Sequence, residues 1–195
     1  MLDIRLSNGN IKVDALIFNL PCFVTCKSGL ECRKYCYARK AEIQYHHVVP
    51  QARQANLDAS KDPSFVQDMI KILSKKRKNT VRIHESGDFY SVEYFNKWVE
   101  IAEAFPEKTF YAYTKRNDLL MYYHTLLKPD NFILIFSIDG IQDKKPCSIP
   151  KGYDSVAYVH ATESNCPAQL NKDIKCGKQC HKCMKSGQVI CFSKH

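Results

Sequence analysis

The sequence predicts an α/β protein, either an incomplete (β/α) barrel or an open parallel sheet, with a cysteine-rich N-terminal loop and C-terminal tail. Apolar, β-capable runs alternate with helical stretches along the middle of the chain, an order that favours parallel strands joined by right-handed crossovers. The 195 residues are too few for a complete eight-fold barrel, which usually needs about 250. Polar side chains also gather after each apolar run, as expected where strand ends carry a site.

The first elements follow from local composition. Residues 12–20 are apolar and β-capable, and this predicted strand ends at Pro21 and the first cysteines. Residues 35–59 favour helix through their Ala, Arg, Glu and Gln content, and Pro50 should interrupt or restart that helix. Apolar residues recur at helical spacing in 64–74, which predicts another helix.

From residue 80 onward, strand-like and helical patterns of apolar residues alternate along the chain. Strands are expected at 80–85, 109–113, 131–138 and 154–160, and helices at 91–104 and 118–127. Ser91 is the expected N-cap of the first of these helices. A loop with Gly and Pro, 140–152, joins the last two strands. We expect one domain over 1–195, with a partial barrel in 1–164, a cluster loop in 22–36 and a cysteine-rich segment in 165–195.

Composition and charge limit the function classes. The chain is 45% hydrophobic and 25% charged, which excludes disordered, collagenous and coiled-coil classes. No stretch approaches the roughly 18–20 apolar residues of a membrane span, and residues 1–14 lack the apolar core of a signal peptide. We therefore expect a cytosolic monomer or weak oligomer with no membrane partner. The net charge of +9 permits a polyanion as partner.

The ten cysteines indicate metal or catalysis before disulfides, because the cytosol keeps thiols reduced. The N-terminal spacing is Cys22-x3-Cys26-x5-Cys32-x3-Cys36. Zinc knuckles pair their ligands closely, whereas this wide, uneven spacing favours a [4Fe–4S] cluster. We expect Cys26, Cys32 and Cys36 as ligands, which leaves one iron open to a substrate. With Cys22 as fourth ligand the cluster would be closed.

The C-terminal cysteines predict a second centre. Its expected ligands are Cys166, Cys176, Cys180 and Cys183. A Cys-Pro pair beside a compact cysteine run is typical of ferredoxin-type ligation, but four cysteines could equally fold this tail around zinc. Both metals therefore stay open for this centre. Cys147 and Cys191 are left unassigned.

Candidate catalytic residues follow the predicted strands. They are His84, Glu85, Asp88, Lys115, Arg116 and His160. The carboxylates and histidines are acid–base candidates, and the two cations would hold an anionic small-molecule substrate. A histidine inside a strand, however, is often a hydrogen-bonded core residue.

Several segments resemble the phage-encoded family labelled gene product eighty-eight: residues 25–42, 82–89, 111–115 and 166–169, with the later tail cysteines. The resemblance covers nearly the whole chain. Members look like distant, shortened relatives of radical S-adenosylmethionine barrels. It therefore implies an iron–sulfur protein of partial-barrel fold, made in the cytoplasm of a bacterial host.

Two departures from the radical enzymes bear on the cofactor. Those enzymes use Cys-x3-Cys-x2-Cys, whereas this chain has Cys26-x5-Cys32-x3-Cys36. Residues 86–88, Ser-Gly-Asp, stand where those barrels carry a Gly-Gly-Glu type motif. One glycine and one carboxylate are kept, so S-adenosylmethionine stays an alternative cofactor rather than the first choice.

Three functions follow, in order of preference. The first is an enzyme whose open iron acts as a Lewis acid, activating water or hydrosulfide in hydrolysis or sulfur handling. The second is a radical S-adenosylmethionine-like enzyme. The third is a cluster- or zinc-stapled protein that binds nucleic acid through aromatics beside basic residues. The two candidate sets for stacking are Arg33, Lys34, Tyr35 and Tyr37, and Tyr111, Tyr113, Lys115 and Arg116.

Overall fold

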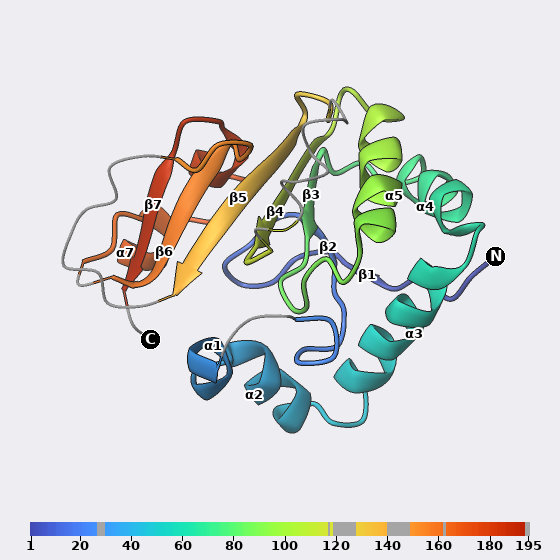
Figure 1. The fold of residues 1–195 in the computed structure, drawn as a ribbon, viewed down its shortest axis with the longest axis horizontal. Coiled ribbons are helices and arrows are strands. Elements are labelled where there is room, and N and C mark those ends of the chain that lie inside the picture. Colours follow the sequence, from blue (N-terminus) through green and yellow to red (C-terminus); the bar gives the residue numbers. More distant parts are fainter. Residues whose placement is uncertain (27–29, 117, 119–127, 140–148, 162, 194–195) are drawn as a thin grey trace.

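The computed structural model describes residues 1–26, 30–116, 118, 128–139, 149–161 and 163–193. These residues form a mixed α/β fold around one mostly parallel sheet, which confirms the predicted class (Figure 1). The seven strands found in them lie side by side in chain order. They are β1 (Leu6–Ser7), β2 (Leu16–Phe18), β3 (Thr80–Ile83), β4 (Thr109–Thr114), β5 (Phe132–Asp139), β6 (Ser155–Ala161) and β7 (Val189–Ser193). Strand β1 pairs antiparallel with β2, and the other neighbours are parallel.

The described helices are α1 (Leu30–Lys34), α2 (Tyr37–Gln44), α3 (Val49–Lys61), α4 (Phe65–Leu73), α5 (Val92–Glu103) and α7 (Pro167–Leu170), with a 3-10 turn, η1 (Lys182–Met184). Helices α4 and α5 occur where they were predicted, whereas the short helices α1 and α7 were not expected. The predicted helix 35–59 is divided into α2 and α3, and Pro50 lies in the first turn of α3, where its missing N–H costs nothing. Ser91 caps α5 by accepting the Tyr94 N–H at 3.1 Å, as predicted.

Some expectations lie outside the described residues. The predicted helix 118–127 is described only at Asp118, and most of the loop 140–152, with Cys147, is likewise outside. Two strands, β1 and β7, were not expected. Strand β1 has only two residues, too few for a periodic signal, and β7 lies inside the cysteine-rich tail, whose spacing dominates its sequence. The tail is thus part of the sheet rather than an appendage.

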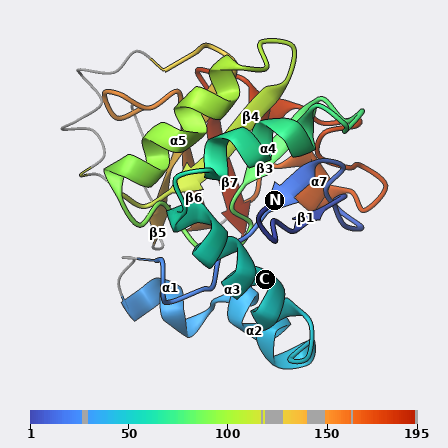
Figure 2. The same cartoon turned by 90° about the vertical axis from the view of Figure 1, so that its right-hand side faces the viewer.

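The main core lies between the sheet and α4 and α5, on what we call the helix face (Figure 2). Phe18 contacts Phe65 and Trp98 edge to face there, with ring centroids 5.7 and 5.2 Å apart. On the opposite face, which we call the tail face, Tyr111, Ile133 and Cys183 share a second core. Helices α1 and α2 lie beyond the carboxyl end of β5 (Figure 1). The carboxyl end of β5 thus lies on the same side of the molecule as α1 and α2.

Within the residues described, no helix combines the length and apolar character needed to cross a membrane.

Candidate functional site

The loop that carries the first cysteines is packed against the turn after β3. Gly87 in that turn has φ +88°, and a Cβ there would lie 2.6 Å from the Leu20 Cβ and 2.7 Å from the Thr25 Oγ1. Ser86 donates its hydroxyl to the Leu20 carbonyl at 2.9 Å. Only glycine tolerates both this backbone conformation and this approach. The turn therefore brings Asp88 next to the cysteine loop, residues 22–36.

Asp88 is buried at the ends of β3 and β4. Its carboxylate accepts the Thr114 hydroxyl at 2.7 Å and the Lys115 backbone N–H at 3.0 Å. Burial raises the pKa of Asp88 even against these hydrogen bonds. This side chain is thus a carboxyl group that tends to keep its proton.

The structure brings Asp88 together with the three cysteines predicted as ligands. Burial, with the negative charges of Asp88, Cys32 and Cys36, raises the pKa of the Cys26 thiol to about 11, although a hydrogen bond with the Phe23 backbone opposes the shift. Cys32 lies on α1 and Cys36 is the N-cap of α2. The group is therefore a cluster of mutually repelling acidic groups, which a cation would stabilise.

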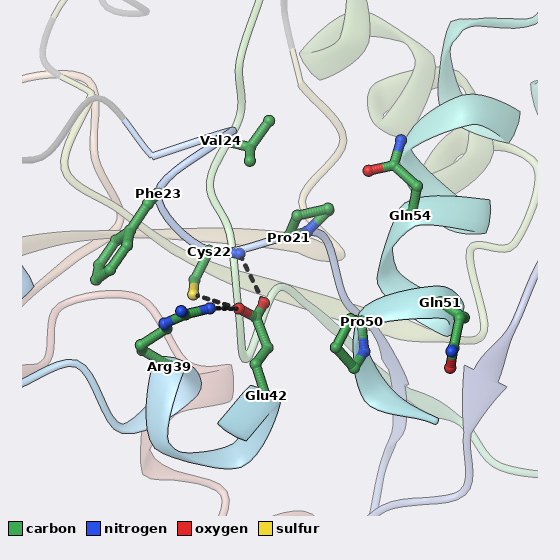
Figure 3. A pocket seen from close by; sticks show the side chains of 9 residues that line it. All are labelled: Pro21, Cys22, Phe23, Val24, Arg39, Glu42, Pro50, Gln51 and Gln54. Carbon is green, nitrogen blue, oxygen red and sulfur yellow. Dashed lines mark hydrogen bonds and ion pairs between the residues drawn. The ribbon is translucent and has the colours of Figure 1, made fainter. Parts of the chain in front are cut away.

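Cys22 is held differently from the other three. Its Sγ donates to the Glu42 Oε2 at 3.1 Å and its backbone N–H to the Glu42 Oε1 at 3.2 Å (Figure 3). Glu42 is in turn paired with the buried Arg53 at 2.9 Å. Burial, followed by the Glu42 carboxylate, strongly raises the pKa of Cys22, while hydrogen bonds from Arg53 and Cys22 outweigh burial and keep the pKa of Glu42 low. Cys22 is therefore a protonated thiol in this fold.

The tail cysteines also come together. Cys166 is the N-cap of α7, the backbone of Cys176 bridges to Val13 and Cys180, and Cys183 lies in η1. A hydrogen bond between the Cys166 and Cys176 side chains lowers the pKa of Cys166 and raises that of Cys176. Charges on Cys180 and Cys183 add to the shift of Cys176. The hydrogen bond thus favours the thiolate form of Cys166 and the thiol form of Cys176.

Arg82 and Tyr113 adjoin this second group, a position that sequence reasoning did not assign to them. Burial raises the pKa of Cys183 to about 11, and a hydrogen bond from Tyr113 and the charge of Arg82 oppose it. The Arg82 guanidinium lies over the Tyr113 ring, 5.7 Å from its centroid, and its Nε is buried without a partner. The sequence did hold a signal for Arg82, because it lies between two buried residues of β3, Val81 and Ile83. Side chains alternate along a strand, which places Arg82 on the tail face.

His84 and Glu85 lie apart from the cysteines in their contacts. His84 is buried with φ +66°, and its Nε2 shares a 2.8 Å hydrogen bond with the Tyr94 hydroxyl. Burial lowers its pKa to about 3, so it is neutral at ordinary pH. Glu85 accepts from the Asn10 amide at 2.8 Å and lies 3.5 Å from the Arg82 guanidinium.

The remaining predicted residues differ in their surroundings. Lys115 donates its Nζ to the Ser137 hydroxyl at 3.2 Å, across the ends of β4 and β5. Arg116 is buried, is paired with Asp118 and donates to the Phe89 carbonyl at 2.6 Å, which commits its guanidinium to the fold. His160 belongs to β6, but its side chain lies outside the described part of the chain.

No three His, Cys, Asp or Glu side chains among the described residues stand in a ready arrangement for a metal ion. Binding of a metal by either thiol group would therefore require rotation of these side chains.

Comparison with known proteins identifies the family of this chain. The family model described as Gene product 88 matches residues 3–195. The chain belongs to the Gene product 88 family. The match spans both cysteine groups and Asp88, and it confirms the resemblance to this family.

Two curated relatives are similar to this member of the Gene product 88 family. The Gene 88 protein of Mycobacterium phage D29 is 28% identical over 157 residues, covering 74% of this chain and 64% of the relative. The Gene 88 protein of Mycobacterium phage L5 is 27% identical with the same coverage. The matched part thus spans less than two thirds of either relative. No solved structure matches the chain.

Proposed function

We propose that the protein is an iron–sulfur enzyme in which Cys26, Cys32 and Cys36 hold a [4Fe–4S] cluster with one open iron. The observation that carries the proposal is the state of Cys22, whose buried thiol donates to Glu42. A cluster ligand must be a thiolate. Since the Cys22 Sγ donates its proton to the Glu42 carboxylate, ionising this thiol would place two negative charges side by side, which makes Cys22 a poor fourth ligand. Three thiolates leave one iron for a substrate.

The chemistry of the donor group supports a cluster at this place. Asp88, Cys32 and Cys36 each raise the pKa of Cys26 through their negative charge. Without a cation, the thiolate forms of these residues oppose one another. The positive charge of an iron–sulfur core would reverse this effect and favour all three thiolates.

When bound, such a cluster supplies a Lewis acid that polarises a carbonyl or activates water or hydrosulfide. Burial raises the pKa of the Asp88 carboxyl group, which would act as acid or base beside Cys26. Lys115, with Ser137 beneath its Nζ, would hold an anionic group of a small-molecule substrate. We assign His84 and Arg116 to maintaining the site, since their hydrogen bonds go to Tyr94, Asp118 and Phe89.

We further propose a second, closed centre held by the tail cysteines, Cys166, Cys176, Cys180 and Cys183. Iron–sulfur is preferred and zinc is the alternative. Its support is the cationic and hydrogen-bonding environment of Cys183, since Arg82 and Tyr113 both favour the thiolate there.

The strand order supports the barrel-like version of the fold. Strands β2 to β7 follow one another without a reversal, whereas a doubly wound sheet reverses its order at a switch point. We infer an incomplete (β/α) barrel with its site at the carboxyl ends of the strands.

The test is a count of iron and sulfide in protein purified without oxygen. We expect Cys26→Ser to lose about four irons per chain, and the matched variant Cys22→Ser to keep them. Cys176→Ser should lose only the second centre. Equal iron loss in Cys22→Ser and Cys26→Ser would contradict the open cluster. Accumulation of 5′-deoxyadenosine after anaerobic reduction with dithionite in the presence of S-adenosylmethionine would replace the Lewis-acid reaction by a radical one.

A further inference from the structure

A cleft of about 550 Å³ opens beside the cysteine loop (Figure 3). Phe23 and Val24 line it from the loop, Arg39 from α2, and Gln51 and Gln54 from α3. This volume lies in the range of small-ligand sites. The cleft thus combines an aromatic ring, a cation and two amides, which the proposed cluster chemistry does not use.

Phe23 is held in the cleft by a strained backbone. Its φ of +65° lies in the left-handed region, which is rare for a bulky residue and persists only where the surroundings impose it. The Arg33 guanidinium lies over the Phe23 ring, 5.4 Å from its centroid. The chain therefore fixes an aromatic ring and a cation together at this wall.

Arg39 brings a second cation to the cleft. Its side chain is 54% exposed and reaches Glu42 only at 3.4 Å. Glu42 already pairs more closely with Arg53, at 2.9 Å. The charge of Arg39 is consequently available to an anionic ligand.

The surface next to the cleft continues the same chemistry. Helix α2 buries Ala38 and Glu42, so its opposite face, with Lys40, is exposed. Tyr35 and Tyr45 flank that helix and are 47% and 56% exposed, and Tyr37 begins it and is 55% exposed. The Tyr37 hydroxyl donates to the Glu85 carbonyl at 2.5 Å. Residues 32–48 contain four Lys and Arg but one acidic residue, the buried Glu42. The surface is therefore basic and carries aromatic rings.

We propose that the cleft binds a nucleoside phosphate unit of single-stranded nucleic acid. The base would stack on Phe23 and phosphates would contact Arg33 and Arg39, while Gln51 and Gln54 line the opposite side of the cleft (Figure 3). The exposed tyrosines and lysines of α1 and α2 extend this site along a strand, which favours a polymer over a free nucleotide. Phe23, Arg33 and Arg39 are not among the proposed cluster ligands.

This surface corresponds to one of the two stacking sets expected from the sequence. Arg33, Lys34, Tyr35 and Tyr37 are all exposed. In the other set, Tyr111 is buried in the second core and Tyr113 packs against it. The fold thus leaves only the first set accessible to bases.

The test measures fluorescence anisotropy of a labelled oligothymidylate of about 15 nucleotides with the full chain, over a series of salt concentrations. We expect the oligonucleotide to bind at least about tenfold more tightly than ATP. The affinity should fall with salt by a log–log slope of roughly −0.7 for each phosphate contact.

Three variants separate stacking, charge and background. Phe23→Gly should raise the Kd about five- to a hundredfold without lowering the melting temperature, since glycine adopts this φ freely. Arg39→Gln should weaken binding and reduce the salt slope by about 0.7. The control Lys71→Gln removes an exposed charge from α4 and should leave the affinity and the salt slope unchanged.

Three results would overturn the proposal: wild-type binding by Phe23→Gly, equal losses in Lys71→Gln and Arg39→Gln, or equal affinity for ATP and the oligonucleotide. Arg39→Gln decides the matter if Phe23→Gly folds poorly. Cys26→Ser should still bind the oligonucleotide, so a failed iron count and a failed binding test are distinguishable.

Discussion

Burial acts on His84 and Asp88 in the same sense, although only one of them lies beside the cysteines. Desolvation disfavours the charged form of each group, so the pKa of His84 falls and that of Asp88 rises. His84 packs against Phe89 and Tyr94, whereas the charge of Asp88 acts on Cys26. Position in the fold, rather than residue type, separates a core group from a candidate acid.

The first prediction concerns His84 and acid stability. Its pKa is about 3 in the fold against 6.5 in the unfolded chain, so only the unfolded state gains this proton as the pH falls below 6.5. The contribution of neutral His84 to stability is therefore fully present above pH 6.5 and is lost progressively as the pH falls to about 3. Between about pH 7 and pH 5 the free energy of unfolding should fall by about 2 kcal/mol from this residue.

Urea unfolding at the two pH values checks this expectation. The comparison is with His84→Asn, which removes the titration while asparagine tolerates the positive φ. The difference between the two proteins isolates His84 from Asp88, whose raised pKa acts in the opposite direction. An unchanged pH dependence in the variant would contradict a buried neutral histidine.

At the scale of elements, the turn after β3 and the cysteine loop depend on each other. The Leu20 N–H donates to the Ser86 carbonyl at 2.9 Å, and Gly87 leaves no room for a Cβ against Leu20 and Thr25. This contact joins two segments far apart in the chain. It sets the position of Asp88 relative to Cys26.

The second prediction is that Gly87→Ala destabilises the protein more than Gly187→Ala. Both glycines have positive φ, but a Cβ at Gly187 would meet nothing within 4 Å. Both substitutions introduce the same kind of backbone strain. The additional loss in free energy of unfolding for Gly87→Ala, which we expect to be about 1–3 kcal/mol, therefore reports the steric clash. Urea unfolding measures it. Iron content should fall in Gly87→Ala alone, and equal effects of the two substitutions would contradict the close approach.

At the scale of the whole molecule, the tail connects distant parts of the sheet. The Cys176 N–H donates to the Lys12 carbonyl at 3.0 Å, and its carbonyl accepts the Asp14 N–H at 2.7 Å, just before β2. Strand β7, which follows in the tail, pairs with β6 and stands five places from β2 in the strand order. A metal centre in this tail would therefore stabilise both regions together.

The third prediction concerns removal of that metal. Ligand binding at about a thousand times Kd stabilises a fold by about 4 kcal/mol, so chelation should lower the melting temperature by roughly 8–16 °C. Cys176→Ser should melt like the stripped protein, and Cys191→Ser, on β7, like the loaded one. Calorimetry with a metal count checks this, and a melting temperature that ignores both chelator and Cys176→Ser would contradict it.

Much of the fold could be predicted from local patterns. Alternating periods predicted the parallel α/β class, Pro50 the restart at α3, and Ser91 the cap of α5. Two strands were not predicted, because β1 is too short to show a periodic pattern and the pattern of β7 is obscured by the cysteine spacing of the tail. Candidate residues at strand ends were also found, but their roles were not, because Arg116 and His84 look the same in sequence as accessible groups.

The sequence by itself determined the fold class and which segments carry cysteines, because periodicity and spacing are local properties of the chain. Only the tertiary structure decided which of those cysteines is held as a thiol. Cys22 meets Glu42 across 20 residues, and Arg53 fixes that carboxylate from another helix. Burial and long-range pairing set the pKa of each group, and both arise from packing between elements rather than from neighbours in the chain.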